Sequence, residues 1–178
     1  MRVATAGVLG LLVNRRAEAS LSRALPLSEL MARSQHVLLG EPLEKYSVWE
    51  QVGGRRHIVT YTRVRALELL AGADPKQDEL LLRTLGGRVG ELGELVHGEA
   101  LINVGERGVL FAMPTQGVLA VTAMAQGHYP LTYDKLGIER LRRSPEATEL
   151  INEQGSAVKQ LHGLRVTEAR TLLRPGHK

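Results

Sequence analysis

The sequence predicts a mainly β protein: a small antiparallel barrel or sandwich of five to six strands, preceded by a short helix and followed by a C-terminal helical extension. Two observations favour this fold class. Short runs rich in Val, Ile, Thr and Tyr alternate with glycine-containing turns over the middle of the 178-residue chain. From Asp134 onward the composition becomes charged and typical of helices. We therefore expect one globular unit built around a β core.

The first elements follow from local signals. Ser28 is a residue type that caps a helix, so a short helix is expected to begin at Glu29. His36 then begins an apolar, strand-like segment that runs to about residue 49. Gly40 and Pro42 predict a bend in this first strand.

The second strand is long and follows a turn at Gly53-Gly54. Val59 and Tyr61 share one face of this strand, whereas Val64 falls on the opposite face. This change of register predicts a bulge or sharp bend at Thr62-Arg63, which would let one strand serve two sheets of a small barrel.

Four further strands and a last helix complete the predicted core. The helix is expected over 168–173 with Thr167 as its cap, before Arg174-Pro175-Gly176 ends it. Pro114 is expected to stop the fourth strand. The expected strands are 78–85, 108–113, 118–127 and 128–133.

The N-terminus resembles a secretory signal peptide. It has a positive start, an apolar run from Val3 to Val13 and an Ala17-Glu18-Ala19 cleavage site before Ser20. We expect export to the periplasm, envelope or medium, with a cytoplasmic protein as the alternative. The predicted organisation is a signal peptide over 1–19, a β-barrel domain over 20–133 and a helical, partly flexible extension over 134–178. The apolar run is too short to span a bilayer.

Composition removes several classes of function. The chain has no cysteine, which excludes disulfides, Cys-ligated metals and thiol nucleophiles. Removing residues 1–19 takes away three arginines and one glutamate, which lowers the formal charge from +4 to +2. Aromatic residues make up only 3% of the chain, so platforms for stacked bases are hard to build. We therefore expect neither a nucleic-acid partner nor a cofactor.

The order of the predicted helix and strands over the middle of the chain resembles the OB-fold barrel of netrin-like domains and of the N-terminal domain of tissue inhibitors of metalloproteinases. The resemblance covers roughly residues 27–133. It also extends to uncharacterised exported bacterial proteins with a GG-x-x-G-x-x-G loop and an AQG-x-[YF] ending, matched here by Gly86 to Gly93 and by Ala125 to Tyr129. The segments that carry it are HVLLGEPLEK, IVTYTRVRALELLAG, ELLLRTLGG, NVGERGVLFAM and VLAVTAMAQGHYPL. The resemblance implies an OB-fold, but the inhibitors bind the protease zinc through an N-terminal cysteine, which this chain lacks.

The glycine-rich stretch RTLGGRVGELGELVHGEA, residues 83–100, is the most suggestive local feature. Its spaced glycines are Gly86, Gly87, Gly90 and Gly93. A phosphate-binding loop needs Lys-Ser/Thr after its last glycine, but Glu94 follows here and neighbouring acids would repel an anion. We expect a structural crossover with glycines at positive φ, whose Leu92, Leu95 and Val96 pack on the core.

Candidate catalytic and metal-binding groups are sparse. His97 and Glu99 could bind a metal, and folding could gather His57, His97 and His128, but neither set has a ligand spacing typical of metal sites. No G-x-S-x-G motif surrounds any serine. We therefore expect no enzyme, with a metal-dependent hydrolase using His97 and Glu99 as the third hypothesis.

A basic cluster on the second strand supports the runner-up hypothesis. Its residues could present cations and one aromatic ring to single-stranded nucleic acid, as in a cytosolic OB-type binder, or could simply keep the strand soluble. The cluster consists of Arg55, Arg56, Tyr61, Arg63 and Arg65. The leading hypothesis is a non-enzymatic, exported binding or structural module whose ligand is another protein. Its binding surface would draw on this cluster, on the four spaced glycines or on His97.

Overall fold

The computed structural model describes residues 22–147 and 150–174. The expected signal peptide, residues 1–19, lies outside these described residues. The described chain is mainly β with short helices, which confirms the predicted class at that level. None of the helices within 22–147 and 150–174 has the length and apolarity needed to cross a membrane.

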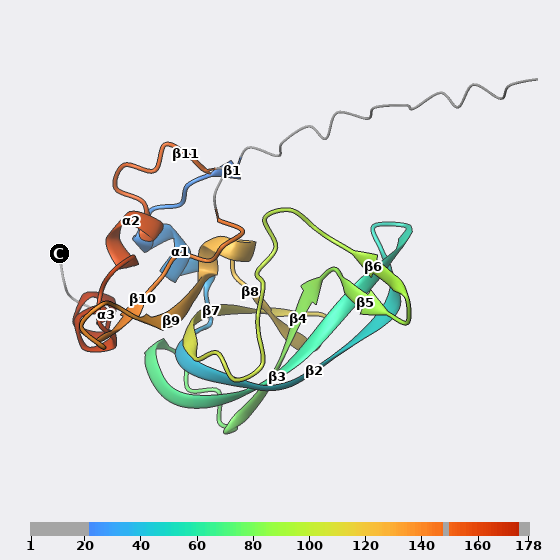
Figure 1. Cartoon of the computed structure of the whole chain (residues 1–178), viewed down its shortest axis with the longest axis horizontal. Helices are drawn as coiled ribbons and strands as arrows, with labels where there is room; N and C mark the ends of the chain where they lie inside the picture. Colours follow the sequence, from blue (N-terminus) through green and yellow to red (C-terminus); the bar gives the residue numbers. More distant parts are fainter. Residues whose placement is uncertain (1–21, 148–149, 175–178) are drawn as a thin grey trace, which may run out of the picture.

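Five strands close into a ring, and two more continue the same sheet outward from it (Figure 1). Around the ring, β7 pairs with β2, β2 with β3, β3 with β4, β4 with β8, and β8 with β7. β9 and β10 extend the sheet from β7. The ring is not a clean barrel, because β4 and β8 share only the pairs Leu82↔Leu119 and Arg83↔Ala120. The strands are β2 (His36–Val52), β3 (Arg55–Gly72), β4 (Glu79–Leu85), β7 (Gly108–Thr115), β8 (Val118–Val121), β9 (His128–Tyr133) and β10 (Glu139–Leu141).

The long β2–β3 hairpin forms where the sequence predicts it. Gly53 and Gly54 have φ of 58° and 80°, so they form a turn with two positive φ angles, the type that matches strand twist. The bulge expected at Thr62-Arg63 is wrong in its position. Inward-facing residues alternate without a break through this part of β3, because threonines occupy two of the inward positions. The pairing of β2 with β3 shifts register at three places: Leu43 of β2 is the extra residue opposite Arg63 and Val64, next to the predicted position, and Leu67 and Leu70 of β3 are the extra residues at the other two.

Strand β7 is buried on both faces, which explains its unbroken apolar sequence. Leu110 and Ala112 face the ring interior, where they join Leu38, Val64, Leu82 and other aliphatic side chains. Val109 and Phe111 face a second core between the sheet and the helices. Contrary to expectation, β7 continues past Pro114, which lies opposite Leu119 of β8. The proline is tolerated because the pairing of β7 with β2 ends at Ala112, so no β2 acceptor needs its N–H.

The second core is covered by three short helices: α1 (Leu27–Arg33), α2 (Ala157–Leu161) and α3 (Val166–Leu173). Leu30, Leu161 and Leu173 are fully buried there against Phe111 of β7. Two predicted caps are wrong. Helix α1 begins at Leu27 after Pro26, so Ser28 lies inside it, and α3 begins at Val166, where the backbone N–H of Arg165 donates to the Glu168 carboxylate at 2.7 Å.

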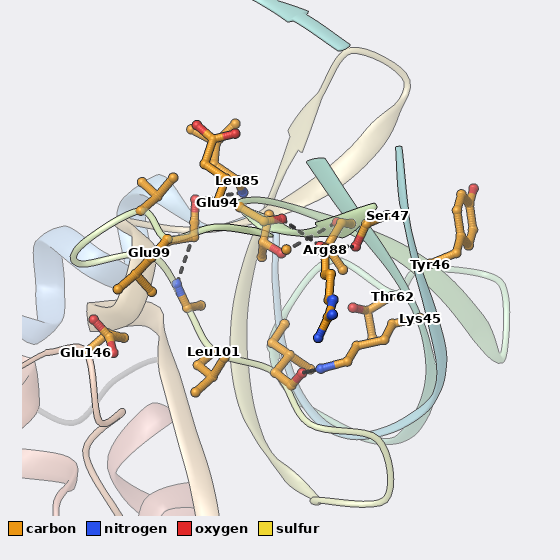
Figure 2. Close-up of a pocket in the computed structure, with 18 residues that line it drawn as sticks. Lys45, Tyr46, Ser47, Thr62, Leu85, Arg88, Glu94, Glu99, Leu101 and Glu146 are labelled. Atoms are coloured by element: carbon orange, nitrogen blue, oxygen red, sulfur yellow. Dashed lines mark hydrogen bonds between the residues drawn. The ribbon is translucent and has the colours of Figure 1, made fainter. Parts of the chain in front are cut away.

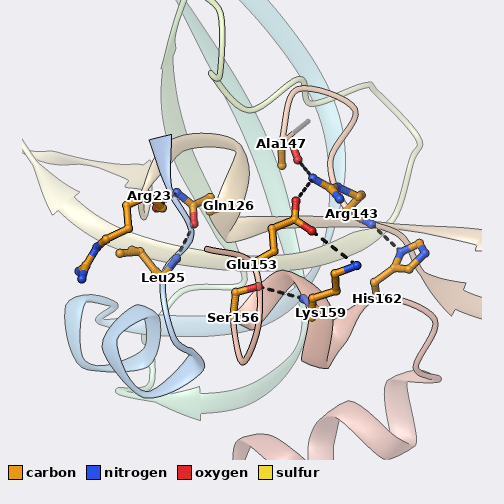
Figure 3. A network of polar contacts seen from close by, with 9 residues as sticks. All are labelled: Arg23, Leu25, Gln126, Arg143, Ala147, Glu153, Ser156, Lys159 and His162. Atoms are coloured by element: carbon orange, nitrogen blue, oxygen red, sulfur yellow. Dashed lines mark hydrogen bonds and ion pairs between the residues drawn. The ribbon is translucent and has the colours of Figure 1, made fainter. Parts of the chain in front are cut away.

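The predicted fifth strand is shorter than expected. β8 ends at Val121, and the 3₁₀ turn η1 (Met124–Gly127) follows. Within this turn, the side-chain amide of Gln126 accepts a hydrogen bond from the Leu25 N–H at 2.8 Å and donates to the Arg23 carbonyl at 3.1 Å (Figure 3). A Cβ at Gly127 would lie 2.2 Å from the Thr122 carbonyl oxygen. The Ala125-Gln126-Gly127 sequence therefore ties the N-terminal segment to the sheet.

The segment after residue 134 contains strands as well as the expected helices. β10 joins the main sheet, and β11 (Leu150–Ile151) pairs in parallel with β1 (Ser22–Arg23). Polar contacts join the residues that follow β10 and β11 to α2: Arg143 donates to the Glu153 carboxylate at 2.9 Å, and Lys159 lies 3.6 Å from the same group (Figure 3). The hydrogen bond from Arg143 lowers the pKa of Glu153. The extension thus packs on the same core as β7 and β9.

Candidate functional site: the crossover cleft

Residues 86–107 cross from β4 to β7 and leave a cleft beside the ring. We call this segment the crossover; it contains a small hairpin of β5 (Gly87–Val89) and β6 (Leu92–Glu94) that the sequence did not indicate. The cleft has a volume of about 490 Å³. Its walls come from β2, β3, the end of β4 and the crossover, together with Glu146 (Figure 2).

The start of the crossover lies tightly against β2 and β3. The Gly86 N–H donates to the Ile58 carbonyl at 2.7 Å, and the Gly86 carbonyl accepts a hydrogen bond from the Thr60 hydroxyl at 2.6 Å. Gly87 has a φ of 131°, and a Cβ there would lie 2.2 Å from the Thr60 oxygen and 2.6 Å from the Ser47 oxygen. Only glycine allows so close an approach with this backbone conformation. The expectation of a structural role for these two glycines agrees with this packing.

Glu94 fastens the β5–β6 hairpin to the adjacent edge of β3. Its carboxylate accepts hydrogen bonds from His57 Nδ1 at 2.6 Å and from the backbone N–H of Ile58 at 2.5 Å. The Ile58 N–H and then the His57 ring hold the pKa of Glu94 below its ordinary value. Because both oxygens have fixed partners, Glu94 acts as a structural anchor for the crossover.

Glu99 places a second carboxylate on the wall of the cleft. It accepts hydrogen bonds from the backbone N–H groups of Leu85 at 3.1 Å and Ala100 at 2.9 Å. Burial raises the pKa of Glu99, while these two N–H groups act in the opposite direction. Glu99 and Glu146 lie on the same side of the cleft in Figure 2.

Two cations occupy the other side. Lys45 of β2 and Arg88 of β5 both extend into the cleft (Figure 2). The Lys45 ammonium donates to the Ile102 carbonyl at 3.1 Å, and Arg88 Nε donates to the Gly90 carbonyl at 2.9 Å. Neither cation forms an ion pair with a carboxylate among the described residues. The cleft is therefore dipolar, cationic at one side and acidic at the other.

The rim of the cleft is apolar and exposed, which corrects one expectation. Leu92 and Leu95 do not pack on the core: 62% of Leu92 and 70% of Leu95 is exposed. Leu95 lines the cleft together with Leu101 and Tyr46, which are about half exposed, whereas Leu92 lies in β6 and does not line it. Leu92 is the first residue of β6 and Leu95 directly follows this strand, whereas the side of the hairpin that faces β2 and β3 is occupied at Gly87 by its contact with Ser47 and Thr60.

The predicted basic cluster lies on β3, and two of its four arginines pair with carboxylates of the neighbouring strands. Arg63 donates to Glu44 at 3.0 Å and to Glu79 at 2.7 Å, and the Tyr61 hydroxyl donates to Glu50 at 2.5 Å. The other arginines differ in setting: Arg65 lies 3.5 Å from Glu41, Arg56 stacks over the Trp49 ring at 5.0 Å, and Arg55 is exposed beside the hairpin turn. None of these five side chains lines the cleft.

The remaining predicted residues are dispersed. Gly90 forms the β5–β6 turn with a φ of 61°, Gly93 lies in β6, and His97 is exposed. His128 is buried between β7 and β9, where burial lowers its pKa to about 4. Across residues 22–147 and 150–174, no three His, Asp or Glu side chains gather as metal ligands would, so His57, His97 and His128 are not brought together.

The sequence did not indicate the two cations that line the cleft. Lys45 and Arg88 are 43 positions apart and belong to no motif, so no local spacing could pair them. The buried Thr60 and Thr62 offered the clearest signal, because they occupy alternate positions on the inner face of β3. Comparison of the chain with protein-family models, with curated proteins and with solved structures found no match.

Proposed function

We propose that the protein is a non-enzymatic, exported binding module that recognises a protein partner at the crossover cleft. The observation that carries this proposal is the exposure of Leu95 on the wall of the cleft and of Leu92 in the nearby strand β6, on a crossover that Glu94 fastens to the ring. Large apolar side chains held rigidly at the rim of a concave surface are typical of interaction sites. A partner would bury them without first having to order the crossover.

We further propose that the five-stranded ring is an OB-type barrel. The support is its closed order β7-β2-β3-β4-β8, its five strands and its long, strongly bent first hairpin. The segments on which the resemblance to netrin-like domains rests form the ring strands β2, β3, β4, β7 and β8. Because OB-folds carry many functions, the proposal about binding rests on the cleft and not on the fold.

The polar groups of the cleft favour binding over catalysis. The carboxylates of Glu94 and Glu99 already accept hydrogen bonds from backbone N–H groups, and the hydrogen-bond partners of Glu99 among the described residues include no histidine. The ion pairs of Arg63 and Arg65 likewise weaken the hypothesis of a nucleic-acid binder, because paired cations release few counterions from a phosphate backbone.

The export part of the proposal rests on residues 1–19 of the sequence and has its own test. The protein is isolated from cell fractions of the organism that makes it, and its N-terminus is sequenced. A mature chain that begins at Ser20 in the envelope or medium is expected. An intact Met1 in the cytosol would exclude export.

The binding proposal is tested by affinity capture from native extracts with three forms of the chain. The wild type is compared with Leu92→Ser/Leu95→Ser, which removes the two most exposed leucines of the crossover, and with Leu136→Ser, which changes a leucine that is 82% exposed in the turn before β10. Proteins captured by the wild type and by Leu136→Ser, but lost with the double variant, are the expected result. A set of captured proteins that is the same for all three would refute the cleft as the binding surface.

A further inference from the structure

Among the described residues, the second half of β2 has a neighbouring strand on one side only. β3 pairs with β2 from His36 to Val52, whereas β7 pairs with it only from His36 to Gly40. On the β7 side, the Gly105 N–H donates to the Pro42 carbonyl, and beyond this point the described residues supply no further strand. Residues 44–52 of β2 therefore present alternate N–H and C=O groups that no strand satisfies, which is a template for adding an extended segment.

This open edge runs along the cleft. The three consecutive residues Lys45, Tyr46 and Ser47 line it, and Leu101 of the crossover lies on another wall of the cleft (Figure 2). Glu44, Lys45 and Tyr46 are exposed, so the edge is accessible. A segment lying on this edge would have apolar contacts with Leu95 and Leu101 on its other side.

The charges of the cleft specify what such a segment must carry. Lys45 and Arg88 enter the cleft without a carboxylate partner among the described residues, unlike Arg63, which has two. Both cations are exposed and donate only to backbone carbonyls, so they remain available to an anionic group, and a guanidinium with an ammonium suits a carboxylate. Three carboxylates also line the cleft: Glu94 is held by His57 and the Ile58 N–H, and Glu99 and Glu146 on the opposite side disfavour a polyanion that would fill the whole cleft.

We propose, building on the proposed function, that the partner supplies an extended peptide segment that adds as a strand to residues 44–52 of β2. An acidic side chain of this segment contacts Lys45 and Arg88, and apolar side chains pack on Leu95 and Leu101. Backbone hydrogen bonds along the β2 edge supply affinity, whereas the two cations select the acidic residue. The occupant is thus a protein segment of alternating apolar and acidic character.

The first experiment selects ligands from a random dodecapeptide phage library on the full chain. Peptides with an acidic residue flanked by apolar residues are expected to be enriched. The selection is repeated on Lys45→Glu/Arg88→Glu and on the control Arg55→Glu/Lys135→Glu, which makes the same charge change at two exposed residues outside the cleft. The cleft variant should lose the preference for acidic peptides, and its affinity for the peptide selected on the wild type should fall by at least about tenfold. The control should keep the acidic preference and the affinity.

The second experiment tests strand addition with the selected peptide itself. Alternate backbone amides are N-methylated in two sets, and binding is measured by fluorescence polarisation. Because a strand bonds its neighbour through every second N–H, one methylated set should abolish binding and the other should leave it nearly unchanged. Equal loss from both sets, or from neither, would overturn strand addition. If the peptides enriched on the wild type carried no acidic residue, or if the cleft variant enriched the same acidic peptides, the role of Lys45 and Arg88 would be overturned.

These outcomes are separate from the test of the proposed function. If captured proteins depend on Leu92 and Leu95 but the peptides show no acidic preference, the cleft binds a partner and the segment proposed here is wrong. If capture is independent of the leucines, the proposed function itself fails. The folding of each variant is checked by its thermal transition, so a loss of binding is not mistaken for unfolding.

Discussion

Glu94 offers the sharpest test of how the crossover is held, because Glu94→Ala removes two hydrogen bonds at once. The Ile58 N–H belongs to a fully buried residue and would lose its acceptor, a loss that costs about 1–2 kcal/mol when water can partly replace it. The His57–Glu94 pair is about one-third exposed, so its loss costs roughly 0.5 kcal/mol more. The expected total is about 2 kcal/mol, equivalent to a fall of about 5 °C in the melting temperature for a chain of this size.

Glu94→Gln separates the two contributions, because the amide oxygen can still accept from the Ile58 N–H. We expect it to cost less than half as much as Glu94→Ala. Since the fold holds the pKa of Glu94 below 4.5, its ordinary value, the ionised carboxylate stabilises the fold above that pH and the stabilisation is lost as the pH falls through the lowered pKa. The difference in stability between wild type and Glu94→Gln should therefore shrink below about pH 4.5.

The assay is urea unfolding followed by circular dichroism at pH 7 and at pH 4. The control is Glu91→Ala, which removes an exposed glutamate three residues away, in the turn between β5 and β6. We expect this control to change stability by less than about 0.5 kcal/mol. If Glu94→Ala proved as stable as Glu91→Ala, or if Glu94→Gln cost as much as Glu94→Ala, the reasoning about the anchor would be refuted.

Three other predictions concern the core, a buried histidine and the glycines. Phe111→Ala should lower the free energy of unfolding by about 3–5 kcal/mol in urea titrations, because the ring is fully buried, and a loss under 1 kcal/mol would contradict the assigned core. His128 has its pKa lowered to about 4 from 6.5, so the fold should lose up to about 3 kcal/mol as the pH falls from 6.5 to 4, and His128→Gln should remove that part of the pH dependence measured by thermal melting. Gly87→Ala should destabilise the fold by well over 1 kcal/mol in the same melting assay, because its Cβ would clash with Thr60. The Cβ of Gly90→Ala meets open space, so this variant should cost only about 1 kcal/mol. Equal costs would argue against the close approach at Gly87.

The main strands could be predicted from the sequence because their signals are local. The Gly53-Gly54 turn and the apolar run over 108–113 each encode an element without reference to distant residues. The short strands β5, β6, β10 and β11 could not be predicted in the same way. Each has only two or three residues, and β10 and β11 form because folding brings them beside β9 and β1.

The cleft was harder to predict than the strands. The glycine-rich stretch was recognised as a structural crossover, and Gly86 and Gly87 do fit tightly against Thr60. Whether Leu92 and Leu95 face the core or the solvent depends on the β5–β6 hairpin, which was not predicted. Their apolar character alone therefore could not show that they are exposed. The basic cluster looked free in sequence, but its carboxylate partners come from adjacent strands. The sequence of one strand does not show which residues of the neighbouring strands form ion pairs with it.

The central claim, that the crossover cleft is the surface that meets a protein partner, is tested most directly by cross-linking in the cells that make the protein. Leu95 is replaced with the photoreactive residue p-benzoylphenylalanine, and Leu136 is replaced in a matched control; both positions are highly exposed. Illumination is followed by detection of higher-mass adducts. A discrete protein adduct at position 95 and none at position 136 is the predicted result. No adduct at position 95, or the same adducts at both positions, would contradict the claim.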